Sequence, residues 1–446
     1  MFSKILIANR GEIALRVIRA CKEMGISTVA VYSAADSEAL HVSLADESIC
    51  IGGNTVAESY LNMDAILSAA MCTQVDAIHP GYGLLSENSR FAELCEKCGI
   101  VFIGPTSETI RSMGDKERAR SVMISAGVPV IPGTDVIDDV TVAKRQAEKI
   151  GFPLLCKARS GGGGRGIRQV DRLEDFENAF LTASTEAAAA FGDGGIYLER
   201  FLTDTKHIEI QLLCDKFENI RCIGERECSV QRKRQKMIEE SPAPTLSEEI
   251  RASMFEASVR AAREVSYLGV GTIEFLLDKS GNYYFMEMNT RLQVEHPVTE
   301  AISGIDLVKW QIRVAAGIPI MFSQEDINTD GHAIECRILA ENPALSFRPS
   351  CGRITELHVP GGPWVRFDSA IYQGYYVPPF YDSMIGKLIV YATTREEAIR
   401  KMRAALCELV IVGIDSNSDF LMEVLGDDEF ISGQYTTSML ENFQFG

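Results

Sequence analysis

Several features are missing from this 446-residue sequence, and each absence excludes a class of protein. It has no run that approaches the roughly 20 apolar residues of a membrane-spanning helix. The N-terminal residues, MFSKILIANRGE, lack the plan of a signal peptide because their short apolar run meets charge at Arg10 and Glu12. The twelve cysteines are scattered without the spacing of a disulfide framework. We therefore expect a cytoplasmic protein that does not bind a membrane.

Positive charge is also scarce, because 44 Lys and Arg stand against 62 Asp and Glu, for a net charge of −18. Such a chain repels nucleic acid and anionic lipid, so we expect no nucleic acid partner. A nucleotide ligand would need Lys and Arg gathered locally. Cys95 and Cys98 form a C-x-x-C pair on an expected helix, but no second pair or nearby histidine completes a zinc site. Reduced helix cysteines are the favoured interpretation.

The length predicts about two to three domains. Roughly the first hundred residues alternate strand and helix patterns, including an amphipathic helix over 12–24 with Ile13, Val17 and Cys21 along one stripe. This alternation predicts an α/β domain with a parallel sheet over 1–113. The pattern changes near 114, and a small α+β unit continues to about 204. Short strands, turns and a final helix over REEAIRKMRAALCEL indicate an α+β domain over 331–446.

Two common phosphate-binding signatures are missing. The first strand–helix turn, NRGE at 9–12, is not G-x-G-x-x-G, and no Gly-Lys-Ser/Thr ends a Walker A loop. Instead, KARSGGGGRG at 157–166 lies between two expected strands, FPLLCKA and IRQV. Consecutive glycines let a backbone approach phosphate oxygens closely, and Lys157, Arg165 and Arg168 add positive charge. We favour a phosphate-binding flap, with a plain flexible hairpin tip as the alternative.

Two acidic residues fall on neighbouring strands of a predicted hairpin, TIEFLL and YYFME. If Asp278 pairs with Tyr283, the antiparallel register places Glu274 opposite Glu287. Like charges directly opposite each other destabilise a sheet, and a bound cation removes that repulsion. Asn289 continues the same face if the strand persists, and three such oxygen ligands suit Mg²⁺ or Mn²⁺ bridging nucleotide phosphates. The alternative is a solvent-facing strand edge with fortuitous acids.

The densest polar run follows at once, in MEMNTRLQVEHP at 286–297. Its oxygen donors Glu287, Asn289, Gln293 and Glu295 surround the guanidinium of Arg291 in sequence. Such a run contributes little to a hydrophobic core. It is suited to holding a divalent cation and an oxyanion close to one another.

Other polar positions carry weaker signals. The stretch from Arg226 to Lys236 holds five cations and is a candidate anion site, with a solvated charged face as the alternative. His207 lies on the alternating strand KHIEIQ, where a lone histidine is more often structural. Arg337 lies two residues from Glu335, so a plain ion pair is the alternative to a functional role there.

Taken together, these segments resemble the biotin carboxylases, meaning the biotin carboxylase subunit of acetyl-CoA carboxylase and the matching domain of pyruvate, propionyl-CoA and methylcrotonyl-CoA carboxylases. The resemblance covers essentially the whole chain and rests on many motifs. They are KILIANRGEIALRVIRAC, HPGYGLLSEN, FIGP, MGDK, the glycine flap, ERECSVQRKRQK, GTIEFL, EMNTRLQVEHPVTE, ECRILAENP and YDSMIGK.

The resemblance implies an ATP-grasp fold. A Rossmann-like N-terminal α/β domain over 1–113 would precede a central ATP-grasp domain over 114–330, whose mobile lid spans about 131–204. A C-terminal α+β domain over 331–446 would complete the chain. It also implies a ligase reaction in two steps. Bicarbonate attacks the γ-phosphate of ATP to give carboxyphosphate and ADP, and carboxyphosphate then delivers CO₂ to the ureido nitrogen of biotin.

The resemblance assigns roles to individual positions of this sequence. Glu295 would be the base that deprotonates bicarbonate, with Arg291 as the second catalytic residue. Lys236, Arg291 and Val294 would position bicarbonate, and Arg337 would contact biotin. Glu274, Glu287 and Asn289 would hold Mg²⁺ or Mn²⁺, in agreement with the hairpin argument. The residues that would surround ATP are Lys116, Lys157, Gly163, Gly164, Glu199, Arg200, Phe201, Leu202, His207, Arg234, Glu274 and Glu287.

Two places depart from the family pattern. Lys233-Arg234 stands where the family usually has Arg-His, and arginine keeps a donor near phosphate but cannot give up its proton. Leu339 replaces the usual asparagine after Cys-Arg-Ile, which removes an amide close to Arg337 and can change the affinity for biotin. Neither change leads us to expect an inactive enzyme.

Two other functions compete with this one. Another ATP-grasp ligase that joins a carboxylate to an amine is disfavoured by VEHPVTE and CRILAEN. A non-catalytic nucleotide-binding regulator is disfavoured by the complete acidic hairpin together with Arg291 and Glu295. The chain has no Met-Lys-Met biotin-attachment segment and no length for a carboxyltransferase. We therefore expect a separate biotin carboxyl carrier protein and carboxyltransferase subunits as partners, a homodimer by resemblance, and acetyl-CoA as final acceptor, with pyruvate or another acyl-CoA as alternatives.

Overall fold

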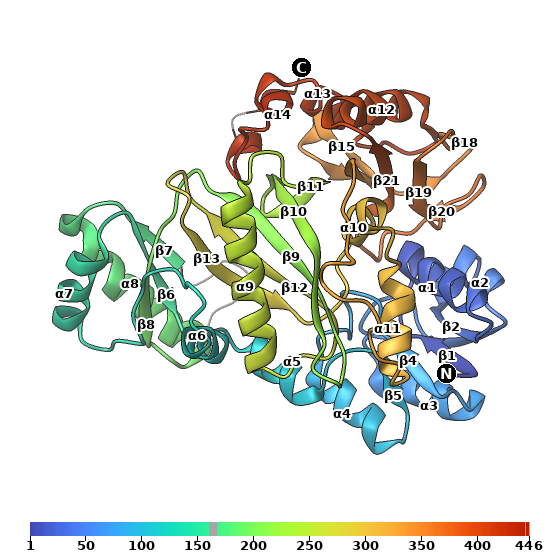
Figure 1. The fold of residues 1–446 in the computed structure, drawn as a ribbon, viewed down its shortest axis with the longest axis horizontal. Helices are drawn as coiled ribbons and strands as arrows, with labels where there is room; N and C mark the ends of the chain where they lie inside the picture. Colours follow the sequence, from blue (N-terminus) through green and yellow to red (C-terminus); the bar gives the residue numbers. More distant parts are fainter. Residues whose placement is uncertain (160–166, 442, 446) are drawn as a thin grey trace.

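The computed structural model describes residues 1–159, 167–441 and 443–445 (Figure 1). The first part of the chain folds around a five-stranded sheet in the order β3-β2-β1-β4-β5, in which every pairing is parallel. Its strands are β1 (Lys4–Ile7), β2 (Ser27–Ser33), β3 (Glu47–Gly52), β4 (Ala77–His79) and β5 (Val101–Phe102). The predicted parallel sheet with helical crossovers is confirmed.

Helices connect these strands because the sequence between them is amphipathic. The helices are α1 (Gly11–Glu23), α2 (Leu40–Leu44), α3 (Met63–Thr73), α4 (Ser89–Lys97) and α5 (Ser107–Gly114), with a 3₁₀ turn η1 (Ala34–Asp36). In α1 the expected stripe of Ile13, Val17 and Cys21 is buried in the core between sheet and helix. The predicted helix over 12–24 is therefore confirmed, with both ends shifted by one residue toward the N-terminus.

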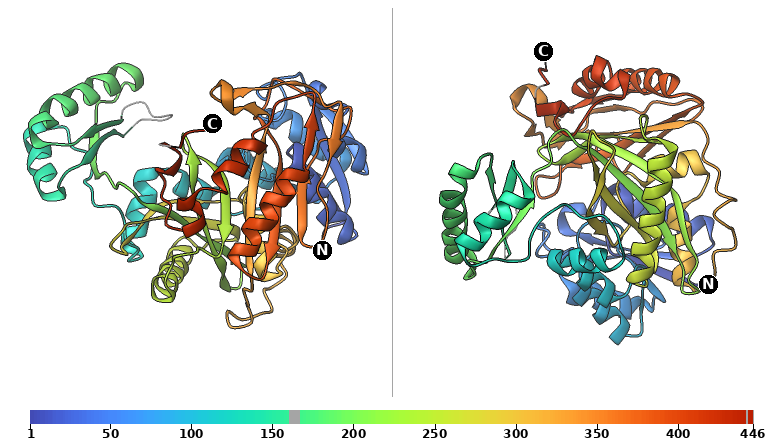
Figure 2. Two further views of the ribbon diagram at one scale, coloured as in Figure 1. Left: turned by 90° about the horizontal axis from the view of Figure 1, so that it is seen from above. Right: turned by 60° about the vertical axis from the view of Figure 1, so that its left-hand side comes forward.

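A small unit stands apart from the rest of the molecule, on the left of Figure 1, and both views in Figure 2 show the same separation. It is a three-stranded antiparallel sheet in the order β7-β6-β8, backed by two helices. Its elements are α7 (Val140–Ile150), β6 (Leu154–Ala158), β7 (Ile167–Val170), α8 (Leu173–Phe191) and β8 (Ile196–Arg200). The expected strand–loop–strand pairing of β6 with β7 is confirmed, and we call this unit the lid.

An eight-stranded sheet forms the centre of the molecule, in the order β13-β12-β9-β10-β11-β14-β21-β19. Its strands are β9 (Lys206–Cys214), β10 (Ile220–Arg232), β11 (Gln235–Ser241), β12 (Gly269–Leu277), β13 (Tyr283–Asn289), β14 (His332–Leu339), β19 (Val365–Ser369) and β21 (Met384–Ala392). Residues from both sides of position 330 thus share one sheet, because β11 pairs with β14.

Helices cover both faces of this sheet. On one face lies α9 (Glu248–Glu264), whose apolar residues pack against β9 and β12. Ser247 caps α9, since its hydroxyl accepts a hydrogen bond from the backbone N–H of Ile250. On the other face α10 (His296–Ser303) packs over β10, β14 and β21. The segments that lead into and away from the central region include α6 (Lys116–Ser125) and α11 (Leu307–Ala315).

The C-terminal region differs from expectation at its end. The predicted last helix is α12 (Arg395–Glu408), but α13 (Ser418–Val424) and α14 (Asp428–Ser432) follow it. These helices are too short to be stable alone, and they form because Phe420, Leu421 and Phe430 pack into the C-terminal core. The small elements are β15 (Glu341–Asn342), η2 (Pro343–Leu345), β16 (Arg348–Pro349), β17 (Gly352–Arg353), β18 (Glu356–His358), β20 (Tyr376–Val377), β22 (Val410–Val412) and η3 (Met439–Glu441). Among the described helices, none combines the length and apolar character that a bilayer crossing requires.

Candidate active site

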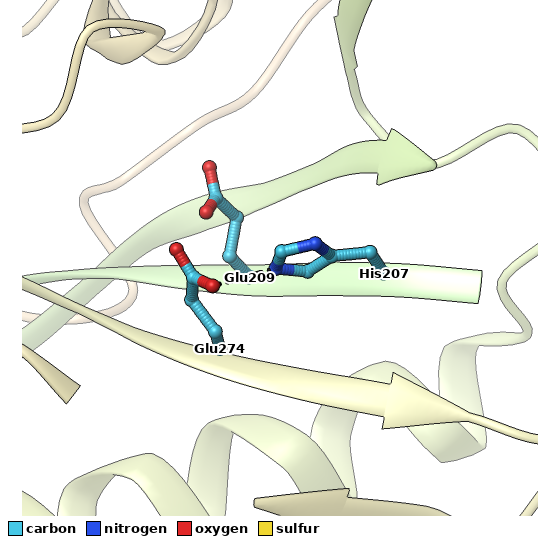
Figure 3. A group of neighbouring side chains, drawn as sticks. All are labelled: His207, Glu209 and Glu274. Atoms are coloured by element: carbon cyan, nitrogen blue, oxygen red, sulfur yellow. Dashed lines mark ion pairs between the residues drawn. The ribbon is translucent and has the colours of Figure 1, made fainter. Parts of the chain in front are cut away.

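Alternation along β9 separates the hydrophobic core from a polar face of the central sheet. Ile208 and Ile210 point into the core under α9, whereas His207, Glu209 and Gln211 lie on the opposite face. Figure 3 shows His207 and Glu209 of β9 beside Glu274, which comes from the neighbouring strand β12. All three side chains are buried, and ligand atoms from each lie within 4.8 Å of one another. The sheet therefore brings polar groups together that are far apart in sequence.

The predicted pairing of Glu274 with Glu287 is confirmed, although the register that led to it is wrong. Leu277, not Asp278, pairs with Tyr283, so the turn is longer than expected. A β-bulge between Glu274 and Phe275 then shifts the register by one residue and restores the pairing of Glu274 with Glu287. The bulge could not be found from residue spacing alone.

The bulge also decides which side chains of β13 face the core. Phe285 and Met288 are both buried in the core under α9, although strict alternation would point them to opposite faces. The extra residue between them lets Glu287 and Asn289 share the polar face with Glu274. The amide of Asn289 donates to the Glu274 carboxylate at 2.8 Å. The three predicted metal ligands thus lie on one face.

The electrostatics of this acidic pair fit a divalent cation. Burial by itself would raise the pKa of Glu274, but Lys236 and then His207, whose Nε2 lies 2.8 Å from the carboxylate, hold that pKa well below its usual value. The pKa of Glu287 shifts in the opposite direction, because loss of solvent around its carboxylate and the charge of Glu274 raise it. A cation bound between these oxygens would relieve the repulsion, and carboxylate and amide oxygens suit Mg²⁺ or Mn²⁺.

We expect Glu287→Gln to weaken metal binding by roughly tenfold or more, because it removes one anionic ligand. The same change removes the repulsion with Glu274, so the thermal midpoint without metal should not fall. The measurement is a Mg²⁺ titration of the thermal midpoint in the presence of ADP. Glu249→Gln, in the exposed first turn of α9, is the control and should leave the titration unchanged. An unchanged titration for Glu287→Gln would refute its role as a ligand.

Lys236 occupies the centre of the polar face. Its ammonium donates to Glu209 at 2.8 Å, to Glu274 at 3.0 Å and to Glu295 at 2.6 Å. Burial disfavours the charged ammonium, yet these carboxylates raise the pKa of Lys236 well above its usual value. Lys236 shares this balance with Arg226, which pairs with Glu209 at 2.6 Å, and with Arg337, which pairs with Glu295 at 2.9 Å. Charge balance therefore does not require a metal between Glu209 and Glu274.

Glu295 accepts hydrogen bonds from two cations, one on each carboxylate oxygen. One carboxylate oxygen accepts from Lys236 at 2.6 Å, and the other accepts from Arg337 at 2.9 Å. Burial and the charge of Glu209 act to raise the pKa of Glu295, but Lys236 and Arg337 outweigh them and lower it. The carboxylate is thus ionised at neutral pH, which is the state that a general base requires.

Arg337 does not form the simple ion pair considered from the sequence. Its guanidinium donates to Glu239 of β11 at 2.6 Å as well as to Glu295. Glu335, two residues away on the same strand, has no hydrogen-bond partner within the described part of the chain, and burial raises its pKa well above normal. Arg337 therefore belongs to the polar site rather than to a local strand contact.

Arg291 is held by the N-terminal domain. Its Nε donates to Glu87 at 2.8 Å, and a terminal nitrogen donates to Asn289 at 2.8 Å. Glu87 belongs to the segment HPGYGLLSEN that follows β4. The guanidinium thus lies between this N-terminal segment and the metal-ligand candidate Asn289.

The basic cluster from Arg226 to Lys236 is not a single anion site. Arg226 is fully buried and donates to Glu209 at 2.6 Å and to Thr299 at 2.9 Å, so it is part of the sheet interior. Lys236 points into the polar face, whereas Lys233 and Arg234 are exposed at the tip of the β10–β11 hairpin. Neither the anion site nor the solvated face describes the whole cluster, because strand alternation divides it.

The remaining predicted ATP residues lie on the lid and its connections. Lys157 on β6 pairs with Glu199 on β8, and Arg200 ends that strand. Phe201 donates its backbone N–H to Pro153 at 3.0 Å, and Leu202 follows on the way to β9. Lys116 begins α6, and its charge partly offsets the rise in the pKa of Glu287. Gly163 and Gly164 lie outside the described residues.

Leu339 lies at the end of β14, where the family pattern has an amide. Its side chain is buried in the apolar C-terminal core, and its backbone N–H donates to Asn417 at 2.8 Å. The side chain therefore contributes to packing beside Arg337. This hydrophobic setting suits leucine.

Sequence reasoning missed two residues that organise the site, Glu209 and Glu239. Both are fully buried, and they hold Lys236 and Arg337 respectively. Glu209 had a detectable signal, because its position two residues after His207 places both on one strand face. Glu239 had no comparable signal, since its partner Arg337 lies on a strand nearly a hundred residues away.

Family models match three consecutive stretches of the chain. Residues 1–110 match the biotin carboxylase N-terminal domain, and residues 335–442 match the biotin carboxylase C-terminal domain. Between them, residues 115–322 match the ATP-binding domain of the carbamoyl-phosphate synthase L chain. The central sheet, the separate lid and these matches define an ATP-grasp protein.

The chain is 52% identical over 445 residues to biotin carboxylase 1 of Bacillus subtilis, covering 99% of both proteins. A biotin carboxylase from Campylobacter jejuni, solved as a β-γ-ATP complex, superposes with a TM-score of 0.93 at 50% identity and 99% coverage of both chains. The biotin carboxylase domain dimer of the Hydrogenobacter thermophilus 2-oxoglutarate carboxylase, solved with MgADP, ADP and bicarbonate, gives 0.92 at 49% identity, covering 100% of this chain and 99% of that one. The chain belongs to the biotin carboxylases. It is accordingly an ATP-dependent ligase whose family uses ATP, a divalent metal and biotin.

Proposed function

We propose that this enzyme carboxylates biotin on a separate biotin carboxyl carrier protein, using bicarbonate and ATP by way of carboxyphosphate. The observation that carries the proposal is the setting of Glu295, an ionised base between two cations, Lys236 at 2.6 Å and Arg337 at 2.9 Å. Bicarbonate is a weak nucleophile, so a base and cationic donors at one place meet its chemical need.

In the first step, Lys236, Arg291 and the backbone at Val294 hold the bicarbonate anion. Glu295 takes the bicarbonate proton, and the resulting oxyanion attacks the γ-phosphorus of ATP, so that ADP leaves and carboxyphosphate forms. When bound to Glu274, Glu287 and Asn289, Mg²⁺ or Mn²⁺ supplies positive charge that neutralises the phosphate oxygens.

In the second step, Arg337 binds biotin and stabilises the negative charge that develops on its ureido oxygen. Carboxyphosphate breaks down to CO₂ and phosphate. The phosphate takes the proton from the ureido nitrogen, which then attacks CO₂ to give carboxybiotin. The buried position of Glu295, 2% exposed, supports this sequence because limited access of water protects carboxyphosphate from hydrolysis.

For ATP we propose the predicted set on the lid and the sheet. His207 and Glu274 contact each other on the sheet, and Lys157 and Glu199 pair on the lid. Closure of the lid over the sheet would bring the second pair to the nucleotide. Lys116, Arg234 and the segment 200–202, with Gly163 and Gly164, complete the proposed set.

The domain organisation and the biological setting are part of the proposal. We place an N-terminal domain at 1–113, the ATP-grasp domain at 114–330 with its lid at about 131–204, and a C-terminal domain at 331–446. The dimer of the Hydrogenobacter domain supports a homodimer. All twelve cysteines are free thiols, which supports the reducing cytoplasm. We propose carboxyltransferase subunits as partners and acetyl-CoA as the final acceptor in fatty acid synthesis, with pyruvate or another acyl-CoA as alternatives.

The deciding assay measures ATP cleavage with and without bicarbonate and then adds free biotin. We expect cleavage that requires bicarbonate and is stimulated by biotin. Stimulation by an amine substrate in place of biotin would favour a carboxylate–amine ligase and refute the proposal. Adding the carrier protein and each carboxyltransferase in turn, with acetyl-CoA, pyruvate or propionyl-CoA, identifies the final acceptor.

A further inference from the structure

Lys387 on β21 is fully buried, and its ammonium donates to the backbone carbonyl of Val294 at 2.6 Å. Val294 immediately precedes Glu295, the proposed base. Burying an ammonium is unfavourable unless anions and hydrogen bonds compensate it. The buried Lys387 therefore needs other groups of the fold to stabilise its charge beside the carbonyl that precedes the base.

The compensating anions come from separate parts of the chain. Glu12 of α1, in the N-terminal domain, lies 3.4 Å from the Lys387 ammonium. Asp368 stands directly opposite Lys387 on β19, and Glu335 lies on β14, the strand on the other side of β21. The charges of Glu12 and Asp368, together with the hydrogen bond to Val294, keep the lysine charged in an interior site, whereas Glu335, whose pKa burial raises, contributes little negative charge at neutral pH.

Other groups also surround Lys387, including Arg337, which stands directly opposite it on β14. Its ammonium lies 5.8 Å from the centre of the Tyr82 ring, and the Tyr82 hydroxyl donates to Glu12. The guanidinium of Arg366, on β19, opposes the positive charge of Lys387 and itself pairs with Asp368. The cluster thus joins the N-terminal domain to β19 and β21, on the sheet face that Lys387 shares with Arg337, its direct partner on β14.

Other contacts hold the segment from Asn289 to Glu295 at Arg291 and at Gln293. Arg291 is bound to Glu87, and the Gln293 amide donates to Glu274 at 2.7 Å. At Val294 the contact is the hydrogen bond from Lys387 on β21. A peptide group is planar, so fixing the Val294 oxygen also fixes the plane that carries the Cα of Glu295.

We propose that Lys387 is a positioning residue for the bicarbonate end of the site. Through the Val294 carbonyl it sets the orientation of the Val294–Glu295 peptide, and so the direction from which the Glu295 carboxylate meets bicarbonate. Glu12 holds the lysine in place from the N-terminal domain. The proposal rests on the proposed function for its kinetic consequence, but its structural consequence can be measured independently.

The test is Lys387→Met, which keeps the length of the side chain and removes the charged donor. We expect the KM for bicarbonate to rise by about tenfold or more, because loss of a charged hydrogen bond releases the peptide next to the base. The KM for ATP should stay within about twofold, since the acidic pair does not depend on this bond. Hydrogen exchange in peptides that cover 290–299 should accelerate.

Lys206→Met is a matched control. The ammonium of Lys206 also donates to a backbone carbonyl, that of Gly433, at 2.8 Å, and lies 3.3 Å from a buried glutamate, Glu227. It lies over the ring of Tyr435, as Lys387 lies near Tyr82. Both variants should lose stability, but the control should leave the bicarbonate KM and the exchange of 290–299 unchanged.

Equal changes in both variants, or an unchanged bicarbonate KM and exchange rate in Lys387→Met, would overturn the proposal. If Lys387→Met does not fold, Glu12→Gln replaces it, and the same changes should appear with smaller size; their absence would also refute the role. If the unmodified protein shows no bicarbonate-dependent ATP cleavage, the proposed function fails, while the exchange of 290–299 still decides whether Lys387 orders that segment.

Discussion

Replacing Glu295 with glutamine will lower the turnover number for bicarbonate-dependent ATP cleavage by about 10²- to 10⁴-fold, the usual contribution of a general base. Glutamine has nearly the same shape, and its one carbonyl oxygen can still accept from Lys236 or Arg337, whereas its amide NH2 loses the bond to the other cation. It cannot take a proton from bicarbonate, so the chemical step loses its base while the size and shape of the side chain are kept. Steady-state kinetics with bicarbonate varied at saturating ATP measure the effect.

Nucleotide binding should survive this substitution, because Glu295 lies at the bicarbonate end of the site rather than at the acidic pair. Equilibrium titration with ADP and Mg²⁺ should therefore give the same affinity for both proteins. Glu227→Gln is the control, since Glu227 is equally buried in the central sheet but pairs with Lys206 outside the site. Turnover that is unchanged in Glu295→Gln, or lost equally in Glu227→Gln, would refute the assignment of the base.

Lys236→Met will destabilise the protein by about 3–5 kcal/mol, the range for a buried ion network that loses one partner. The lysine pairs with three buried carboxylates, at 2.8 Å, 3.0 Å and 2.6 Å, and methionine removes that cation from all of them. Two of these are Glu274 and Glu295. The pKa of Glu295 should rise as well, because its lowering depends in part on Lys236. Activity should therefore fall together with stability.

Urea unfolding measures this loss of stability through the midpoint and the slope. The matched control is Lys279→Met, whose ammonium forms an equally short pair, 2.9 Å to Asp204, but is 72% exposed. Water screens that pair, so the control should change the free energy of unfolding by less than about 1 kcal/mol. Similar losses in the two variants would show that the carboxylates around Lys236 are stable without its charge.

Much of the fold was predictable because local patterns carry it. The alternation of strands and helices before Gly114 predicted the parallel sheet, and the stripe of Ile13, Val17 and Cys21 predicted α1. The helices α13 and α14 were missed because they depend on packing around Phe420 and Phe430 rather than on their own length. The continuity of the central sheet across position 330 was also missed, since no local pattern states which distant strands pair.

The site divides in the same way. The pairing of Glu274 with Glu287 was predicted correctly from residue spacing. The register used for that prediction was wrong by one residue, and the bulge in β13 shifts the strands by one residue and so restores the pairing. Glu209 was missed although its signal was present in the strand alternation. Glu239 had to come from the structure, because β11 and β14 meet only in the folded sheet.

The sequence by itself determined the chemical inventory of this protein: an acidic hairpin, a run that joins Glu287 to Glu295, and motifs whose resemblance indicated the family. These are properties of neighbouring residues, and local spacing records them. Only the tertiary structure decided which charges meet. Lys236 and Arg337 converge on Glu295, and Lys387 reaches the Val294 carbonyl, because distant strands of one sheet lie side by side. These residues are far apart in the sequence, so local patterns do not predict their contacts, which form only when the strands pair in the sheet.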